Sequence, residues 1–454
     1  MIQRTRMAAP LGVAIALSSG PAFATGPGTF GHGARSAGLA QSDIAGAEAS
    51  NAPQANPALA ATPGFRLRLG YAYGGMDLTI NGESGGVRDV SGVDFAAQFG
   101  AQAGRDVTLG LALAAHIPDQ YLARVAFRPA TEPQFVRYEA SLQRMTVDVV
   151  GALRYGPLAV GGGVAATLDV GGRGTDFKLG QDANGTYADA ATDIELPYHF
   201  APLIGVEVDL GRVAIGAAFH GPLAIDLRLE SRNEIALTDN PLNGTTTVVV
   251  SGASGYDPAL IDFGARFTVG AGLTAFAALE YAVYSAAPPP VADVVLDVRL
   301  GTTPSQREAR FVEPRLRDTL SPRFGLELVR PDPAESAPRK SAGSPGTAHS
   351  RGGAAVAVPW RWGVRAGYVL SPSPLPPQNG FTSYADATRH GLAVGGGYRF
   401  GRVAGVDLAV QVAGQVHVLA KRLEVKPSPA LPHARYEVGG HMLYGAASLE
   451  GVWR

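Results

Sequence analysis

The run best suited to chemistry in this sequence is short and rich in glycine. Gly82-Glu83-Ser84-Gly85-Gly86 fits the G-x-S-x-G pattern that presents a nucleophilic serine in hydrolases. Such a serine works only at a sharp turn from a strand into a helix, with a nearby base to accept its proton. Here the run follows Asn81 in a turn-like stretch, and no helical pattern follows it. A plain turn is therefore favoured, and we predict no catalytic residue and no enzymatic activity.

Other catalytic and metal-binding patterns are missing from the sequence. It has no cysteine, which excludes disulfides, thiolate nucleophiles and zinc ribbons. No lysine follows a glycine, as a phosphate-binding loop requires, and no histidine precedes a glutamate, as in the helix of zinc proteases. The 38 basic and 39 acidic residues leave a net charge of −1, which argues against a nucleic acid partner. We predict no cofactor and no metal.

The first 24 residues have the features of an export signal. Two arginines precede Met7, an apolar run extends to Leu17, and residues 21–24 end in the small-x-small pattern of a cleavage site. The apolar run is much shorter than the roughly 20 residues of a membrane-spanning helix. We therefore expect the chain to be exported and cleaved after Ala24.

Apolar and polar residues alternate along many segments of the remaining chain, which is 46% apolar and only 17% charged overall. Between Val406 and Val418 the even positions are mostly valine or leucine, whereas the odd positions include Asp407, Gln411 and Gln415. Successive side chains of a strand point to opposite faces, so this pattern predicts strands with one oily and one polar face. Most such runs are long enough to cross a bilayer at a tilt. About fourteen can be counted, at residues 65–74, 90–100, 105–118, 138–156, 158–172, 198–210, 211–231, 258–269, 272–285, 318–330, 357–370, 387–400, 403–423 and 436–454.

Long and short connections alternate between these strands. Short turns on one rim, long loops on the other, an even strand number and an export signal are typical of an outer-membrane β-barrel. We predict an all-β, antiparallel transmembrane barrel over residues 65–454. One connection, residues 331–354, is rich in Pro, Ser, Ala and Gly where a tight periplasmic turn is expected, which predicts a flexible insertion rather than a docking tail. The long connections are residues 119–137, 173–197, 232–257, 286–317, 371–386 and 424–435.

Residues 25–64, called here the N-terminal segment, form no predicted strand but carry distinctive motifs. Phe30 precedes residues 36–40 (SAGLA), and residues 55–59 (ANPAL) lie shortly before the first strand. Near the C-terminus, residues 371–374 (SPSP) lead to an acidic and then arginine-containing strand start. These motifs resemble those of the FadL-type outer-membrane transporter family, whose members open with a serine-glycine-leucine-alanine element and an asparagine-proline-alanine element.

The resemblance implies a function and a gate. Members of this family admit long-chain fatty acids or other hydrophobic small molecules passively through a barrel plugged by an N-terminal hatch. It implies a greasy lumenal pocket and a kinked third strand, residues 109–118, that opens sideways into the membrane. It also implies a Gram-negative outer-membrane location, lipid and lipopolysaccharide neighbours, and a monomer. The hatch and gating residues would be Phe30, Ser36, Gly38, Leu39, Asn56, Pro57 and Ala58, with the last three against the kink.

Substrate contacts inside the barrel are less defined by the sequence. A fatty acid carboxylate in an apolar lumen would need a cation or several hydrogen-bond donors. Each lumen-facing arginine could instead pair with an internal acid such as Asp148 or Glu327, and pairing is favoured for any one of them. No substrate-binding residue is assigned. The arginines that face the lumen by phase include Arg144, Arg154, Arg323 and Arg365.

Two other functions remain open. A structural or adhesive barrel would have an occluded lumen and would use long loops such as 173–197 and 286–317 for contacts. A membrane-embedded lipid hydrolase would use Ser84 with a histidine partner, and its esterase activity would be lost on Ser84→Ala.

Overall fold

A computed structural model describes most of the chain: residues 26–120, 131–138, 144–168, 171–182, 185–195, 198–237, 243–270, 272–287, 293–300, 303–309, 315–331 and 360–453. The predicted export signal and the predicted insertion beyond Pro331 lie outside these residues. Within them, no helix is long and apolar enough to cross a membrane.

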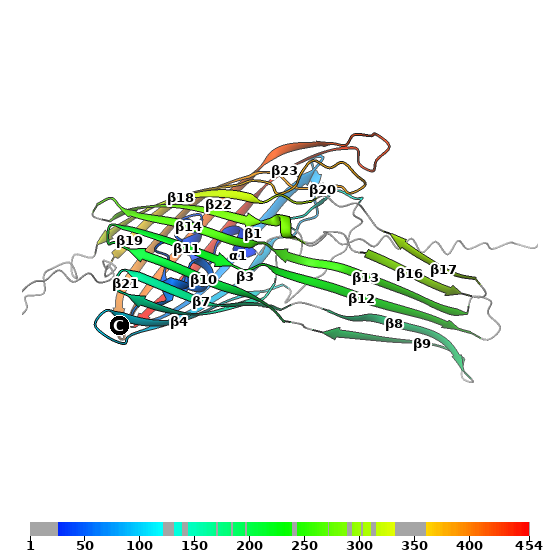
Figure 1. Ribbon diagram of the computed structural model, residues 1–454, viewed down its shortest axis with the longest axis horizontal. Coiled ribbons are helices and arrows are strands. Elements are labelled where there is room, and N and C mark those ends of the chain that lie inside the picture. The colour runs from blue at the N-terminus through cyan, green and yellow to red at the C-terminus, as the bar shows by residue number, and fades with distance from the viewer. Residues whose placement is uncertain are drawn as a thin grey trace, which may run out of the picture.

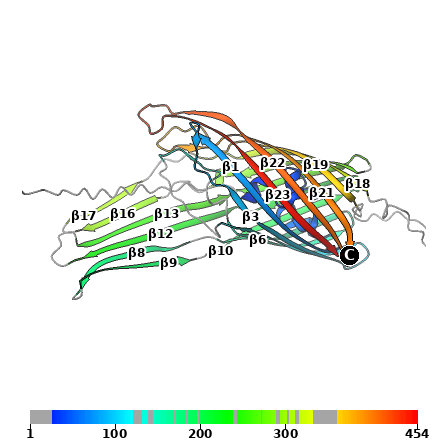
Figure 2. The ribbon, with the colours of Figure 1, turned by 180° about the vertical axis from the view of Figure 1, so that it is seen from behind.

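Fourteen antiparallel strands form a closed barrel (Figures 1 and 2). The first strand pairs with the second on one side and with the last on the other, so the ring has no unpaired edge. This confirms the predicted fold class and strand number. The barrel strands are β1 (Gly64–Ile80), β3 (Val90–Gln102), β4 (Val107–Pro118), β6 (Thr146–Tyr155), β7 (Leu158–Leu168), β10 (Tyr198–Asp209), β11 (Val213–His220), β14 (Ala259–Thr268), β15 (Leu273–Val283), β18 (Thr319–Pro331), β19 (Trp360–Ser371), β21 (Arg389–Val403), β22 (Val406–Val425) and β23 (Arg435–Trp453).

The two faces of the barrel wall differ as the alternation predicts. On β22, Val412 and Val416 are 52% and 47% exposed, whereas Gln411 and Gln415 are 0% and 4% exposed. The apolar side chains therefore face outward and the polar ones inward, which is the inverse of a soluble protein. This orientation suits a wall that contacts lipid on its outside.

Connection lengths divide the barrel into two rims. Short turns join β3 to β4, β6 to β7, β10 to β11 and β21 to β22, and the end of β23 lies at the same rim as the start of β1 (Figure 1). The end of β18 at Pro331 and the start of β19 at Trp360 also lie at this rim. The long connections lie at the opposite rim, as predicted. The short-turn rim is therefore the periplasmic one.

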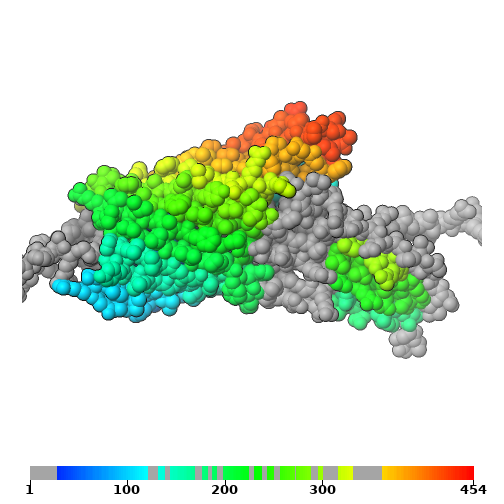
Figure 3. All heavy atoms as spheres, in the orientation of Figure 1, coloured from blue at the N-terminus to red at the C-terminus, as the bar shows by residue number. Residues whose placement is uncertain are grey.

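The long connections contain a second sheet of six strands, which the sequence reasoning assigned mostly to loops. It extends beyond the outer rim (Figures 1 and 3) in the order β17 (Thr303–Ala309), β16 (Asp293–Leu300), β13 (Gly244–Asp257), β12 (Leu223–Ala236), β8 (Gly171–Asp182) and β9 (Gly185–Glu195). The threonine and valine residues of β13 favour a strand. The polar residues of this segment led to the prediction of a loop instead.

Two predicted strand boundaries are wrong. The predicted strand 211–231 breaks at Gly221 and Pro222, because proline has no N–H to continue the ladder, and the later half joins the second sheet as β12. The predicted strand 138–156 starts only at Thr146. Residues 134–135 form instead a short strand, β5 (Gln134–Phe135), which pairs in parallel with β20 (Tyr384–Ala385).

The N-terminal segment lies inside the barrel, where it is drawn in dark blue (Figures 1 and 2). It consists of short helical turns joined by irregular chain: α1 (Gly26–Phe30), α2 (Gly33–Gly38), η1 (Ala49–Asn51), α3 (Ala52–Ala55) and η2 (Pro57–Ala60). Its small residues are largely buried, among them Ala37, Ala52 and Ala58 at 0 to 1% exposure. A segment rich in alanine and glycine can place its backbone directly against the wall.

Lumen-facing glycines make this close approach possible. A Cβ added to Gly161 of β7 would lie 2.5 Å from the backbone carbonyl carbon of Pro57, and one added to Gly367 of β19 would lie 2.5 Å from that of Leu39. Side chains larger than hydrogen therefore cannot occupy these positions without moving the segment. Comparable positions on other strands are Gly100, Gly110, Gly205, Gly216, Gly264 and Gly325.

We predict that Gly161→Ala destabilises the protein by about 1–3 kcal/mol, the usual cost of overpacking a filled interior. Gly151→Ala is the matched control, since a Cβ there would meet nothing closer than 3.9 Å. Urea unfolding of the purified protein in detergent, followed by tryptophan fluorescence, measures both. Equal midpoints for the two variants would contradict the close contact.

Candidate functional site

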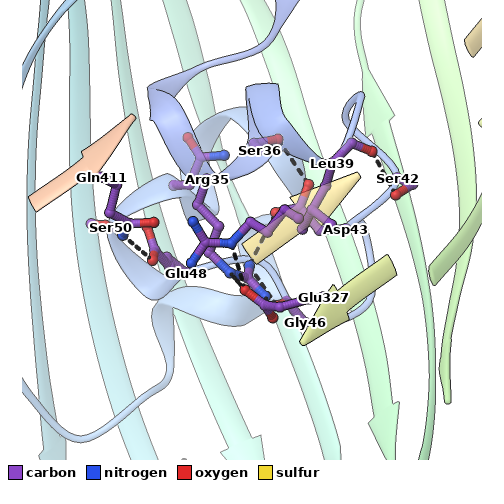
Figure 4. A network of polar contacts seen from close by, with 12 residues as sticks. Arg35, Ser36, Leu39, Ser42, Asp43, Gly46, Glu48, Ser50, Glu327 and Gln411 are labelled. Carbon is purple, nitrogen blue, oxygen red and sulfur yellow. Dashed lines mark hydrogen bonds and ion pairs between the residues drawn. The ribbon is translucent and has the colours of Figure 1, made fainter. Parts of the chain in front are cut away.

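A buried ionic network fixes the N-terminal segment to the wall (Figure 4). Arg35 of α2 donates two hydrogen bonds to Glu327 of β18, from Nε to Oε1 at 3.0 Å and from Nη2 to Oε2 at 2.7 Å. Arg365 of β19 donates to the same carboxylate at 2.7 Å. Arg35 Nη1 also donates to Asp43 at 3.2 Å, and Ser36 Oγ donates to Asp43 at 2.8 Å. The network therefore joins α2, at the start of the SAGLA motif, to β18, and ties Asp43 to the same helix.

Glutamines of β22 and an aromatic stack hold the first turns of the segment. Gln415 Nε2 donates to the carbonyl oxygens of Phe30 and Ala37, both at 2.7 Å. The Phe30 ring stacks on Tyr444 with centroids 4.6 Å apart and an interplanar angle of 10°. Gln411 donates to Glu48 at 2.6 Å. Phe30 therefore anchors the segment through both its ring and its backbone.

Asn56 ties the second motif to the wall. Its Nδ2 donates to the carbonyl of Val206 in β10 at 3.0 Å and to that of Ile44 at 3.2 Å, while its Oδ1 accepts from the backbone N–H of Ala58. The side chain thus caps η2, and Pro57 supplies the fixed φ at its first position. Asn56, Pro57 and Ala58 are all buried.

The structure shows where the N-terminal segment meets the third barrel strand, β4. Asn56 and Pro57 pack against β7, β10 and β11, and Ala52, Leu59 and Ala60 cluster with Ala112 of β4. β4 also pairs with β3 and with β6 without any register shift. Since each β4 backbone group from Thr108 to His116 lies in a continuous ladder on both sides, the wall has no opening there.

Between the segment and the outer half of the barrel lies a cavity of about 200 Å³. The resemblance implies a greasy pocket, and the lining of this cavity combines apolar with charged side chains. Along with alanines and leucines it is lined by carboxylates, arginines and histidines from the segment and from strands around the ring. The charged and imidazole side chains that line it include His32, Asp43, Arg137, Asp148, His220, Asp257, Asp262, Glu280, Arg323 and Arg389.

Arg137 and Tyr138, from the described stretch 131–138, line the cavity. Arg137 is buried and donates from Nε to Asp386 at 2.9 Å, from Nη1 to Ser371 at 2.9 Å and from Nη2 to the carbonyl of Ala387 at 2.9 Å. Ser371 is the first residue of the SPSP motif, and Asp386 belongs to the acidic strand start that follows it. The motif therefore binds an arginine from another loop.

The arginines that face the lumen by phase are paired, as the sequence reasoning favoured. Arg365 pairs with Glu327, its predicted partner, and Arg144 contacts Asp257 at 3.2 Å. Arg154 donates to Glu207 at 2.5 Å, and Arg323 forms an ion pair with Glu280. These four side chains hold the barrel interior together.

Arg389, at the start of β21, is different. It is 6% exposed and lines the cavity, yet its Nε and Nη1 make no hydrogen bond with any described residue. No carboxylate forms an ion pair with it in the part of the chain that the structure describes. A buried guanidinium normally has such partners, because leaving it without them is costly.

Burial sets the charges of the segment itself. It lowers the pKa of the His32 imidazole to about 3, with Asp94 opposing the shift and His116 and Arg68 adding to it. Burial also raises the pKa of Asp43, against the influence of Arg35. Burial alone would lower the pKa of Arg35, but the ion pair with Glu327 raises it above the usual value. At neutral pH the segment therefore presents a neutral His32 and a charged Arg35.

The serine of the G-x-S-x-G run does not lie at a turn from a strand into a helix. Ser84 belongs to β2 (Glu83–Ser84), a two-residue strand that pairs with Thr79 and Ile80 in a hairpin. The described chain then leads into β3 and not into a helix. The geometry that the nucleophile reading requires is not present at Ser84.

Replacing Glu327 by Gln should loosen the segment, since it leaves the buried Arg365 with a neutral partner and Arg35 with Asp43 as its remaining carboxylate. Breaking a buried ion pair typically costs about 3–5 kcal/mol. The chain has no cysteine, so Ala52→Cys, at a buried position, gives a unique maleimide-reactive reporter. We predict faster labelling in the Glu327→Gln background. Lys421→Gln, which breaks the exposed pair with Glu437, should leave the rate unchanged.

Comparisons with known proteins place this fold. No family model matches the sequence, and no curated protein matches it either. A FadL homologue from Pseudomonas aeruginosa is 12% identical with a TM-score of 0.52, over 96% of this chain and 99% of that one. The monoaromatic hydrocarbon channel CymD (12%, 0.49, 94% and 98%) and the Ralstonia pickettii toluene transporter TbuX (11%, 0.47, 94% and 99%) are similar more distantly. The chain therefore has the fold of a FadL-type outer-membrane transporter.

Proposed function

We propose that this protein is an outer-membrane channel for passive uptake of hydrophobic and amphipathic small molecules, long-chain fatty acids among them, gated by the N-terminal segment. The observation that supports this most is Arg389, a buried arginine that lines the cavity and has no ion-pair partner among the described residues. A structural barrel gains nothing from such a group, because a buried charge without a partner destabilises the fold. A binding site for an acid accounts for it, since a carboxylate would complete a bidentate pair.

The position of the segment explains why a gate is needed. The segment lies inside the barrel (Figure 1), and on the outer side of the cavity Arg137 binds Ser371, Asp386 and the carbonyl of Ala387. The cavity of about 200 Å³ is smaller than common ligand pockets of roughly 300–1,000 Å³. A short acid can occupy it directly, whereas a long alkyl chain requires the segment to move. The continuous pairing of β4 favours exit past the segment toward the periplasm over exit through the wall.

The second sheet does not conflict with uptake. It extends beyond the outer rim (Figures 1 and 3), and of its described residues Leu223 of β12 and Asp257 of β13, at the barrel ends of these strands, line the cavity. A contact role for the long connections, the adhesive alternative, can therefore coexist with a channel. The cavity and its arginine carry the uptake proposal independently of that sheet.

Arg389→Gln should reduce uptake of a labelled fatty acid by roughly tenfold, the effect of losing one charge-assisted contact of about 1.5–3 kcal/mol. Cells lacking their own transporter provide the background. Arg105→Gln, at an exposed position in a periplasmic turn, is the control. Surface expression and heat modifiability confirm assembly of each variant. Uptake that is independent of Arg389 would leave the head-group site without support.

A reversible crosslink tests the gate. Ala40 of the segment and Ala393 of β21 pack in one buried cluster, so Ala40→Cys with Ala393→Cys should form a disulfide in this cysteine-free chain. We expect the oxidised protein to lose most uptake of long-chain acids and to regain it on reduction. Mass spectrometry verifies the crosslink, and the single variants are controls. Full uptake by the oxidised protein would show that the segment need not move.

A further inference from the structure

Besides Arg389, the cavity contains a second charged group without an opposite charge. Asp148 of β6 is 7% exposed and lines the same cavity. No described cation forms an ion pair with it, and the side chain that interacts with it is the neutral amide of Gln54. Its cross-strand neighbours are Ala114 on β4 and Ala165 on β7. The carboxylate therefore stands alone on a wall of small apolar residues.

The two unpaired charges lie on opposite walls. Along the sheet order β6-β4-β3-β1-β23-β22-β21, Arg389 is six strands from Asp148, and the other way round the ring it is eight. Asp148 is the third residue of β6 and Arg389 the first of β21, so both lie near the outer rim. They cannot neutralise each other directly across a filled barrel, yet both face the same cavity.

A hydrogen-bond acceptor without a donor lies beside Asp148. Gln54, whose side chain interacts with Asp148, has a buried Oε1 that makes no hydrogen bond with any described residue, and it lines the cavity. His220 Nε2, which also lines the cavity, makes no hydrogen bond with the described residues either. Buried polar atoms are rarely left in this state. A hydrogen-bond donor that enters the cavity near Asp148 would therefore find acceptors besides the carboxylate.

We propose that the cavity selects bipolar acids: molecules with a carboxylate at one end for Arg389 and an ammonium or hydroxyl donor at the other end for Asp148. This rests on the proposed channel function and narrows its substrate class. An unsubstituted acid satisfies Arg389 but leaves Asp148 buried with an alkyl chain against it. A hydrocarbon satisfies neither charge. A bipolar acid satisfies both, and its methylene chain packs on the intervening alanines and leucines.

Binding of three matched compounds tests the proposal: octanoate, ω-hydroxyoctanoate and ω-aminooctanoate, with shorter and longer homologues of each. Titration calorimetry on the full-length protein in detergent gives the affinities. We expect the two ω-substituted acids to bind about tenfold more tightly than octanoate at their best chain length. Because the span between the two charges is fixed, the bipolar series should show a length optimum that the unsubstituted series lacks.

Variants of Asp148 separate the two ends. Asp148→Asn keeps the shape and an acceptor, so it should remove the preference for the ammonium but retain part of that for the hydroxyl. Asp148→Leu should remove both, while octanoate binds as before or better. Asp77→Asn, at an exposed position on β1, is the control. If Asp148→Leu does not assemble, the Asn variant still decides the ammonium preference.

The outcomes distinguish this inference from the channel proposal. Octanoate binding as tightly as its ω-substituted forms, or an unchanged preference in Asp148→Asn, overturns the bipolar site but leaves the channel intact. Loss of binding to all three acids in Arg389→Gln is expected under both. If no acid binds the wild-type protein at any length, the head-group site and the proposed uptake of acids both fall.

Discussion

Charges inside a closed barrel filled by its own chain have no bulk water to face, and this constraint organises the interior. Each lumenal arginine must be paired, and most are: Arg365 and Arg35 share Glu327, and Arg154 has Glu207. These pairs do not make the barrel more stable than a greasy interior would, because desolvation offsets much of the attraction. They do fix which parts of the chain meet. The pairing of Arg35 with Glu327 places α2 against β18 and with it the whole N-terminal segment.

The same constraint identifies the site. Among the charged side chains that line the cavity, Arg389 and Asp148 are the two that form no ion pair with a described residue. A folded protein keeps such groups only where something outside the chain completes them, since their burial otherwise costs free energy. The polar residues that line the cavity therefore indicate the chemistry of a ligand, whereas the apolar outer face indicates only that the barrel contacts lipid.

Much of the architecture could be predicted from the sequence, and the reason is periodicity. A strand that crosses lipid must alternate, so the oily positions of β22 marked both its faces and its length. Irregular features of the fold have no periodic pattern in the sequence. The second sheet was missed because strands in water need no oily face. Proline at position 222 indicates a break in the predicted strand 211–231. Apolar and polar residues alternate on both sides of it, however, and this alternation predicts one continuous strand.

The site was less predictable, because its partners are far apart in the sequence. The motif residues Phe30, Leu39 and Asn56 contact the wall, and Ser36 bonds to Asp43 within the segment, but Arg35 and Asp43, which form the ionic network, are marked by no sequence pattern. Their partner Glu327 is 292 positions away from Arg35. The alternation alone indicates that Glu327 has a partner, since an acidic side chain on the inner face of an otherwise apolar strand needs a cation nearby.

Glycine residues of the wall determine how closely the N-terminal segment can approach it. It makes up 59 of the 454 residues, and several lumen-facing glycines stand where the segment's backbone passes within contact distance of the wall. A wall bearing side chains at those heights would hold the segment farther out and leave the Arg35 guanidinium short of Glu327. The small residues on both surfaces therefore set the reach of the ionic network. That reach in turn confines the remaining free space to the outer half of the barrel, where the two unpaired charges face it.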